Sequence, residues 1–140
     1  MIALSNSCVF CKIIDDSAES SEVYRDEFCV AFLDSSPINP GHTLVCPTRH
    51  ISSFIDLEAN ELLAILSAAQ RIARNQLAKM PNCSGVNLLL SEGEDAGQEV
   101  PHAHFHVVPR GEDDGFGWQR FGSPQTRDEL DAISAQIQIR

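Results

Sequence analysis

Three histidines, His102, His104 and His106, alternate with apolar residues in the segment 102–108. On a β-strand, residues two apart point to the same face and lie about 6.6 Å from each other. The alternation therefore predicts a strand with three imidazoles on one face and core residues on the other. Three titratable groups on one face cost desolvation and, when charged, mutual repulsion. The pattern indicates function: either a metal-ligand set, since alternate histidines on a strand suit zinc, or nucleophilic and acid–base catalysis by imidazole.

The composition is that of one globular domain. The chain has 140 residues, of which 43% are hydrophobic and 21% charged, which is enough to bury a core in a single domain over 1–140. Its 10 Lys and Arg against 20 Asp and Glu give a net charge of −10, which argues against a nucleic-acid partner held through phosphates. A small anionic ligand stays compatible with this charge, because local dipoles can outweigh the mean field.

Hydrophobic patterning along the chain predicts an α+β fold. Apolar residues at spacings of three and four indicate one long helix over 57–79, with Asp56 as its N-cap and Pro81 preventing its continuation. A Thr-x-x-Glu capping box opens a short C-terminal helix over about 126–138. Apolar segments predict five strands, at 23–24, 28–33, 42–46, 86–90 and 102–108. Because neighbouring strands have short connections, we expect an antiparallel five-stranded sheet.

Neither a membrane span nor a leader pattern is found in the sequence. No run approaches the roughly 20 apolar residues that cross a bilayer, and the N-terminal residues lack a basic region followed by an apolar one. We therefore expect a cytoplasmic protein without a membrane partner, whose cysteines are thiols or metal thiolates. Cys29, Cys46 and Cys83 lie in apolar surroundings and are expected to be buried. Cys8 and Cys11 form a CxxC pair that fits zinc, redox chemistry or chance, and redox is weakened because no helix N-terminus follows a βαβ-type strand here to activate the thiol.

The segment 96–110, AGQEVPHAHFHVVPR, resembles the signature of the histidine-triad family of nucleotide hydrolases and transferases. Further blocks that resemble the family stand at 8–14, 31–34, 40–45 and 114–118. The resemblance covers residues 8 to about 118, leaves only the C-terminal helix unmatched, and is closest to the phosphoramidase-like bacterial members of the Hint branch.

The resemblance implies a covalent mechanism. In that family the middle histidine attacks the α-phosphorus of a nucleotide and forms a nucleotidyl-histidine that water cleaves, so His104 is implied as the nucleophile. Neutral imidazole suits this attack because it brings no negative charge to the phosphate. The backbone carbonyl of His102 is implied to hold the other nitrogen of His104. His106 is implied to contact the phosphate or the leaving group, and His42 matches the fourth active-site histidine of the family.

The resemblance also implies a nucleotide-binding set. Asp34 matches the carboxylate that binds both ribose hydroxyls. The residues that match positions around the base are Phe10, Ile13, Phe32 and Leu33. Ser91 falls where relatives usually have an asparagine that contacts the sugar or phosphate. Gln98 matches a phosphate-side glutamine seen in part of the family, and Gly97 permits close approach of the backbone.

Glu99 departs from the family pattern, because many relatives have a small hydroxyl residue there that donates to the α-phosphate. An ionised carboxylate cannot donate a hydrogen bond and repels a phosphate. Two explanations follow. Either the backbone N–H of Glu99 binds while its side chain turns away, or the substrate preference differs.

Four residues match a zinc site found in some similar proteins: Cys8, Cys11, His50 and His102. A set of two cysteines and two histidines is closed and tetrahedral, hence structural. Zn²⁺ is thus the expected cofactor, and no organic cofactor is implied. The alternative is a pair of reduced cysteines with a surface His50.

The leading functional hypothesis is a hydrolase that releases a nucleoside monophosphate from a purine nucleoside phosphoramidate. Alternatives are a dinucleoside polyphosphate hydrolase, a zinc hydrolase that uses His102, His104 and His106 as ligands, and a nucleotide-binding regulatory module. The expected partners are a small nucleotide and, by the resemblance, a second copy of the chain in a homodimer.

Overall fold

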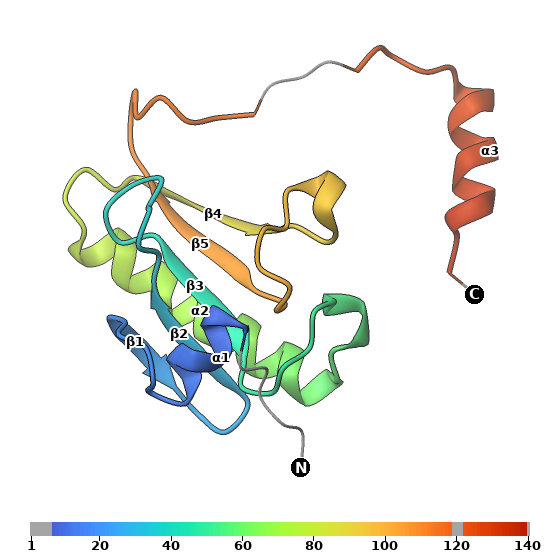
Figure 1. The fold of residues 1–140 in the computed structure, drawn as a ribbon. Helices are drawn as coiled ribbons and strands as arrows, with labels where there is room; N and C mark the ends of the chain where they lie inside the picture. Colours follow the sequence, from blue (N-terminus) through green and yellow to red (C-terminus); the bar gives the residue numbers. More distant parts are fainter. Residues whose placement is uncertain (1–6, 119–121, 140) are drawn as a thin grey trace.

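The computed structural model describes residues 7–118 and 122–139 and has an antiparallel sheet at its centre (Figure 1). Along the sheet the strands follow the order β1-β2-β3-β5-β4, and each pairs antiparallel with its neighbours. Their bounds are β1 Glu22–Arg25, β2 Cys29–Leu33, β3 Thr43–Pro47, β4 Gly85–Leu90 and β5 Phe105–Arg110. The predicted α+β fold with a five-stranded antiparallel sheet is confirmed.

The long helix α2, Ala59–Lys79, covers one face of the sheet and contacts four of its five strands, β2 to β5. The predicted N-cap Asp56 is wrong, because that residue ends a 3-10 turn, η1 Phe54–Asp56, and Glu58 caps the helix instead. The backbone N–H of Glu58 donates to Glu61 Oε1 at 2.9 Å. Arg49 Nε donates to the other oxygen of Glu61 at 2.7 Å, so one buried carboxylate ties the helix start to the chain after β3.

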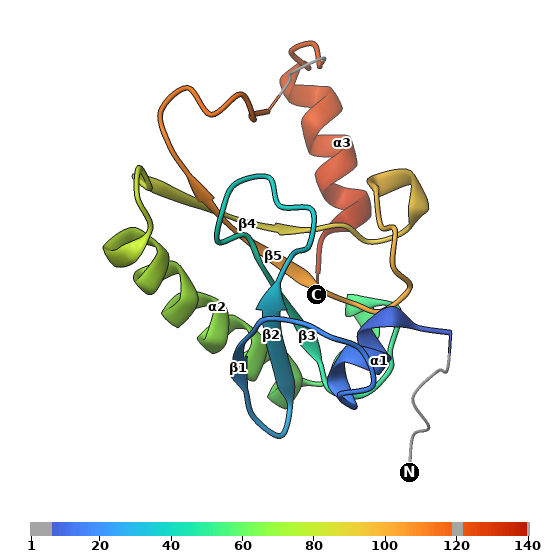
Figure 2. The same cartoon turned by 60° about the vertical axis from the view of Figure 1, so that its left-hand side comes forward.

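Between α2 and the sheet lies the larger apolar core. Ala103, Phe105 and Val107, the residues that alternate with the histidines, point into it as predicted. Ile65 of α2 is fully buried there, and removal of such a side chain from water contributes roughly 2 kcal/mol. The face opposite α2 carries a second cluster, which a short helix α1, Val9–Ile14, covers (Figure 2). The sequence gives no period for α1 because six residues make fewer than two turns.

The histidine strand begins later than predicted. β5 starts at Phe105, because its first ladder partners are Val45 on β3 and Leu90 on β4, and His102 and His104 precede it. Pro109 is tolerated inside β5 because β3 pairs with β5 only as far as Val107, so no ladder hydrogen bond is lost on that side.

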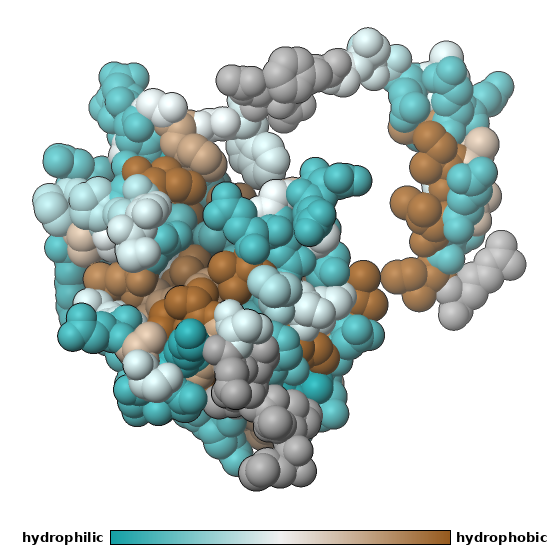
Figure 3. All heavy atoms as spheres, in the orientation of Figure 1, coloured by the Kyte–Doolittle hydropathy of each residue, from teal (hydrophilic) through white to brown (hydrophobic). Residues whose placement is uncertain are grey.

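The C-terminal helix α3, Arg127–Ile137, begins after Thr126 with the predicted capping box to Glu129. It buries none of its residues and stands apart from the sheet, with apolar side chains along one side (Figure 3). In the described residues no helix is long and apolar enough to span a membrane. Cys29 and Cys46 are fully buried as expected, whereas Cys83, two residues before the edge strand β4, is only half-buried.

Candidate active site and metal centre

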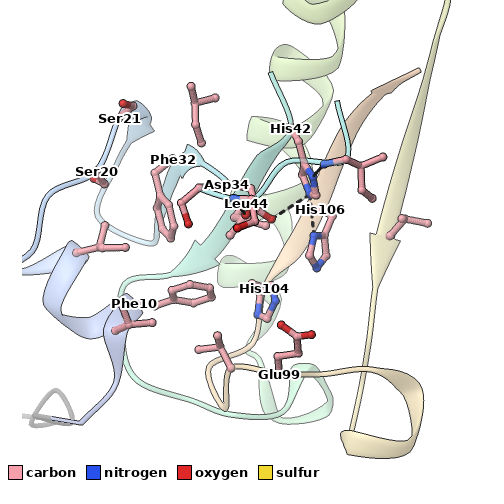
Figure 4. A pocket seen from close by; sticks show the side chains of 18 of the residues that line it. Phe10, Ser20, Ser21, Phe32, Asp34, His42, Leu44, Glu99, His104 and His106 are labelled. Atoms are coloured by element: carbon pink, nitrogen blue, oxygen red, sulfur yellow. Dashed lines mark hydrogen bonds and ion pairs between the residues drawn. The ribbon is translucent and has the colours of Figure 1, made fainter. Parts of the chain in front are cut away.

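A cleft of about 1190 Å³ opens on the face of the sheet that carries α1 (Figure 4). His42, His104 and His106 line this cleft. Seven of the eight residues predicted to bind the nucleotide line it as well: Phe10, Ile13, Phe32, Leu33, Asp34, Ser91 and Gly97. The fold therefore brings segments from α1, β2, β3, β4 and the approach to β5 into one concave surface.

The imidazole of His104 has a defined tautomer. Its Nδ1 lies 2.7 Å from the backbone oxygen of His102. A carbonyl only accepts, so Nδ1 carries the proton and Nε2 keeps a lone pair. The edge of the Phe10 ring packs against the imidazole, with centroids 5.0 Å apart. Burial lowers the pKa of His104, while the hydrogen bond to His102 and the charges of Asp34 and Glu99 oppose this shift. The result is a neutral imidazole with a free nucleophilic nitrogen.

A backbone N–H also sets the tautomers of His42 and His106. The N–H of Ile38 donates to His42 Nδ1 at 3.0 Å, so the proton of a neutral His42 lies on Nε2. That nitrogen is 2.9 Å from His106 Nδ1 and donates to it, which leaves the proton of His106 on Nε2. His106 thus offers an N–H to a group in the cleft. Burial, then the neighbouring histidines His104 and His42, lower the pKa of His106 to about 4.

Asp34 serves both the loop and the cleft. Its Oδ1 accepts from the N–H of Ser36 at 2.8 Å, a local turn contact that holds the start of the loop after β2. Its Oδ2 lies 3.6 Å from His42 Nε2. The carboxylate is thereby fixed at the wall of the cleft, with its side chain 21% exposed to solvent.

Gln98 differs from the other predicted nucleotide contacts because it is absent from the lining of the cleft. Its Oε1 accepts from the N–H of Gly93 at 2.9 Å, and its Nε2 donates to the backbone oxygens of Ser52 and Val100. The side chain holds the loop that carries Gly97, whose φ of +98° favours glycine. For its side-chain amide to donate to a phosphate, the hydrogen bond to Ser52 or the one to Val100 would have to break.

Glu99, in contrast, lines the cleft. Its carboxylate lies beside His104 on the side away from Phe10 (Figure 4). Of the two explanations for this residue, the one in which its side chain turns away is therefore wrong.

The four residues predicted to bind zinc also lie together. Cys8 Sγ and Cys11 Sγ are 3.5 Å and 3.6 Å from His102 Nδ1, and His50 Nδ1 is 3.1 Å from Cys11 Sγ. All four ligand atoms lie within 4.8 Å of one another. His102 Nε2 donates to the backbone oxygen of Pro47 at 2.9 Å, so the lone pair of Nδ1 faces the sulfur atoms. These residues fit a zinc ion because their donor atoms are of the right type and lie close together. The hydrogen bond from His102 Nε2 to Pro47 also leaves Nδ1 free to bind the metal.

This arrangement bears on two interpretations. The helix α1 begins directly after Cys8, its N-cap, but it precedes β1 and so does not follow a βαβ-type strand. His50 and His102 complete the four-residue set and favour zinc. The zinc hydrolase site is wrong, because His102 turns its Nδ1 to the cysteines and does not converge with His104 and His106 on one ion.

Comparisons with known proteins agree with this geometry. The HIT domain family matches residues 16–113. Protein hit of Bacillus subtilis is 38% identical over 142 residues, which cover 97% of this chain and 95% of that protein. A HIT family protein from Bacillus anthracis has a crystal structure with a TM-score of 0.85 and 40% identity, covering 95% of this chain and 96% of that one.

Three further relatives have informative names. A Zn-bound histidine triad family protein from Mycobacterium smegmatis has a TM-score of 0.75 and 35% identity, covering 94% of this chain and 95% of that one. An adenylylsulfatase of Arabidopsis thaliana is 35% identical over 111 residues, 79% of this chain and 56% of that protein. A bis(5'-nucleosyl)-tetraphosphatase of Schizosaccharomyces pombe is 36% identical over 91 residues, 65% of this chain and 50% of that protein. By the extent of its family match and the identity of its full-length relatives, the chain belongs to the HIT domain family of nucleotide hydrolases and nucleotide-binding proteins.

Proposed function

We propose that the protein hydrolyses a purine nucleoside phosphoramidate at the α-phosphorus, through a nucleotidyl intermediate on His104, and releases a nucleoside monophosphate. One observation carries the proposal. The contact of His104 Nδ1 with the carbonyl of His102 leaves Nε2 of a neutral imidazole open to the cleft. Simple nucleotide binding does not require a nucleophile held in this way.

The chemistry follows from the tautomers. Nε2 of His104 bonds to phosphorus as the P–N bond breaks, and the electron pair of that bond stays on the leaving nitrogen. The Nε2–H of His106 stabilises the phosphoryl oxygens or the departing group by a hydrogen bond. Water then cleaves the bond between phosphorus and Nε2. The two protons of that water balance the two that convert the departing amide nitrogen into an ammonium group.

The substrate orientation follows from the two ends of the cleft. Phe10 and Phe32 pack edge to face, with centroids 5.3 Å apart, and offer an apolar wall for a purine. Asp34 lies between this wall and the histidines (Figure 4) and is suited to accept hydrogen bonds from ribose hydroxyls. The α-phosphorus would then lie at His104 and His106.

The charge of the cleft favours a phosphoramidate over the alternative, a dinucleoside polyphosphate. Among the described residues that line the cleft, none is Lys or Arg, whereas Glu19, Asp34 and Glu99 are acidic. A chain of several phosphates usually requires cationic side chains or a metal to hold it. The adenylylsulfatase and the tetraphosphatase among the relatives support nucleotide chemistry in general and leave this choice to experiment.

Zinc, where bound, would be held by Cys8, Cys11, His50 and His102 and would supply structural stabilisation rather than an activated water. His102 links the two sites through its backbone, because the carbonyl that orients His104 belongs to the same residue. The zinc site would therefore fix the position of this carbonyl.

We also propose a cytoplasmic homodimer. The edge strand β4 exposes Leu88, and α2 exposes Leu63 and Leu66, with exposed fractions of 49%, 68% and 44%. A second copy that pairs with this edge would bury these side chains. Light scattering on purified protein would distinguish a dimer of about twice the chain mass of 15.4 kDa from a monomer.

The decisive experiment measures AMP release from adenosine 5'-phosphoramidate with and without a chelator, beside His104→Ala. We expect release that resists chelation while the protein stays folded, and a loss of at least 1000-fold in His104→Ala. Release that depends on added metal would contradict the imidazole mechanism. Tight AMP binding without release of AMP would favour the regulatory module, and cleavage only of diadenosine polyphosphates would favour the alternative hydrolase.

A further inference from the structure

Glu99 is a charged residue in the cleft that the chemistry above does not use. Its side chain is exposed to the cleft and lies beside the nucleophile His104 (Figure 4). The loop that presents it is fixed: Gln98, its neighbour, makes three hydrogen bonds with backbone groups at 2.8 to 3.1 Å. These hydrogen bonds hold the backbone from which the Glu99 side chain extends into the cleft.

The position of Glu99 relative to the two ends of the cleft decides what it faces. Phe10 and Phe32 lie on one side of His104, and Glu99 lies on the other (Figure 4). A nucleoside that occupies the apolar end places its α-phosphorus at His104, and the leaving group on that phosphorus lies in the part of the cleft that Glu99 also lines. In-line attack expels the leaving group on the side of phosphorus opposite Nε2 of His104. A second charged group on the leaving amine is within a few bonds of phosphorus, so the charge of Glu99 acts on it.

The charged side chains that line the cleft are acidic. Among the described residues of its lining none is Lys or Arg, and the histidines are His42, His104 and His106. Burial keeps His106 neutral near pH 7, because its pKa is lowered to about 4. A leaving group beside His104 therefore meets the negative charge of Glu99 without a Lys or Arg in the lining to compensate it.

We propose that Glu99 is a specificity-determining residue that selects leaving amines carrying a second, positively charged group, and disfavours leaving groups that carry phosphate or carboxylate. This rests on the proposed function and names the substrate class within it: nucleoside phosphoramidates of diamines or of basic amino acids. The reaction is the one written above. The P–N bond breaks, its electron pair stays on nitrogen, and water supplies both protons, while the remote ammonium of the leaving group stays charged beside Glu99.

The test uses three adenosine 5'-phosphoramidates of similar leaving-group length, made from ethylenediamine, propylamine and β-alanine. With wild-type protein we expect kcat/KM to fall about fivefold from the cationic to the neutral substrate, and about fivefold again to the anionic one, as for single charges in a solvent-open cleft. Glu99→Gln should bring the three values within about twofold. High salt should weaken the wild-type order.

A matched control separates position from net charge. Glu19→Gln removes the same charge from a residue beside Ser20, at the nucleoside end of the cleft, and should keep the wild-type order. An order that survives Glu99→Gln, or that Glu19→Gln abolishes equally, would overturn the proposal.

The same substrates also test Glu99 without turnover. Calorimetry with His104→Ala and with His104→Ala/Glu99→Gln gives the order of dissociation constants. If wild-type protein cleaves none of the three, the proposed function fails. A charge order in binding that disappears with Glu99→Gln would still support the selection by Glu99, and its absence would overturn that as well.

Discussion

Two histidine-containing clusters include the two ends of the segment 102–106, and they have similar sets of donor atoms. One has Cys8, Cys11, His50 and His102, and the other has Asp34, His42 and His106. In each, the donor atoms lie within 4.8 Å of one another. Proximity alone therefore does not distinguish a metal site from a catalytic site.

The hydrogen bonds behind the histidines distinguish them. His102 donates its remote N–H to the carbonyl of Pro47, the arrangement that leaves the other nitrogen free for a metal. His42 instead accepts the N–H of Ile38 on its remote nitrogen. A metal on Nε2 of His42 would put a proton on Nδ1, against the N–H of Ile38. The first cluster is thus suited to zinc, and the second to passing hydrogen bonds toward a substrate.

The largest expected effect concerns zinc stoichiometry. Cys11→Ser removes a thiolate ligand, so zinc per chain should fall from about one to near zero in protein dialysed against a buffered low zinc concentration. Asp34→Asn removes the carboxylate of the other cluster and should leave the stoichiometry unchanged. A second zinc per chain in wild type, lost in Asp34→Asn, would break the comparison.

The free energy of unfolding should depend on zinc at the first cluster and much less on Asp34 in the second. A ligand that binds only the folded state at about 100 times its Kd stabilises it by roughly 2.7 kcal/mol. Chelation should therefore lower the free energy of unfolding by about 3 kcal/mol, whereas Asp34→Asn, at a part-exposed side chain, should change it by less than about 1 kcal/mol. Denaturant titrations with and without chelator measure both. Equal effects of chelator on wild type and on Cys11→Ser would contradict the assignment of the ligands.

Sequence reasoning reached the members of both clusters but not the feature that separates them. The alternation in 102–108 correctly predicts that Ala103 and Phe105 lie in the core. On an extended chain, alternate side chains point to opposite faces, and this depends only on neighbouring residues. Where β5 begins is not local, since it depends on Val45 and Leu90 as ladder partners. The role of His102 as a donor is not local either, because it depends on the carbonyl of Pro47, and that of His106 depends on His42.

The two loop residues Gln98 and Glu99 show the same limit. Family resemblance predicted a phosphate contact for Gln98, but the backbone groups that its side chain binds come from Gly93, Ser52 and Val100. Nothing in the adjacent sequence indicates Ser52 as a partner. Conversely, the sequence marked Glu99 as a departure, and only the fold shows that its carboxylate enters the cleft.

A smaller effect is expected for ribose recognition by the second cluster. Asp34→Ala should lower kcat/KM for adenosine 5'-phosphoramidate about tenfold, the loss of roughly one charge-assisted hydrogen bond. The 2',3'-dideoxy substrate lacks both hydroxyls and should lose less than about twofold in the same variant. The ratio of the two losses is the informative quantity, because any general disturbance of His42 would lower both substrates equally. Equal losses would assign Asp34 to His42 rather than to the sugar.

The smallest expected effect is that of mild acid on turnover. A histidine of ordinary pKa, about 6.5, is only about one-tenth neutral at pH 5.5. The pKa of His106 is lowered to about 4 by burial and the adjacent histidines, so it stays almost wholly neutral at pH 5.5 and is protonated only as the pH falls through 4. Burial lowers the pKa of His104 in the same direction. Turnover of a substrate whose own ionisation is constant over this range should therefore fall by clearly less than the tenfold that a histidine of ordinary pKa would give between pH 7.5 and 5.5. Zinc content measured on the same samples separates the clusters, because a loss of metal would lower activity through the first cluster alone. A tenfold fall in turnover with zinc retained would mean that His104 or a histidine of the second cluster titrates near its ordinary pKa, and the neutral forms assigned to His104 and His106 would then have to be abandoned.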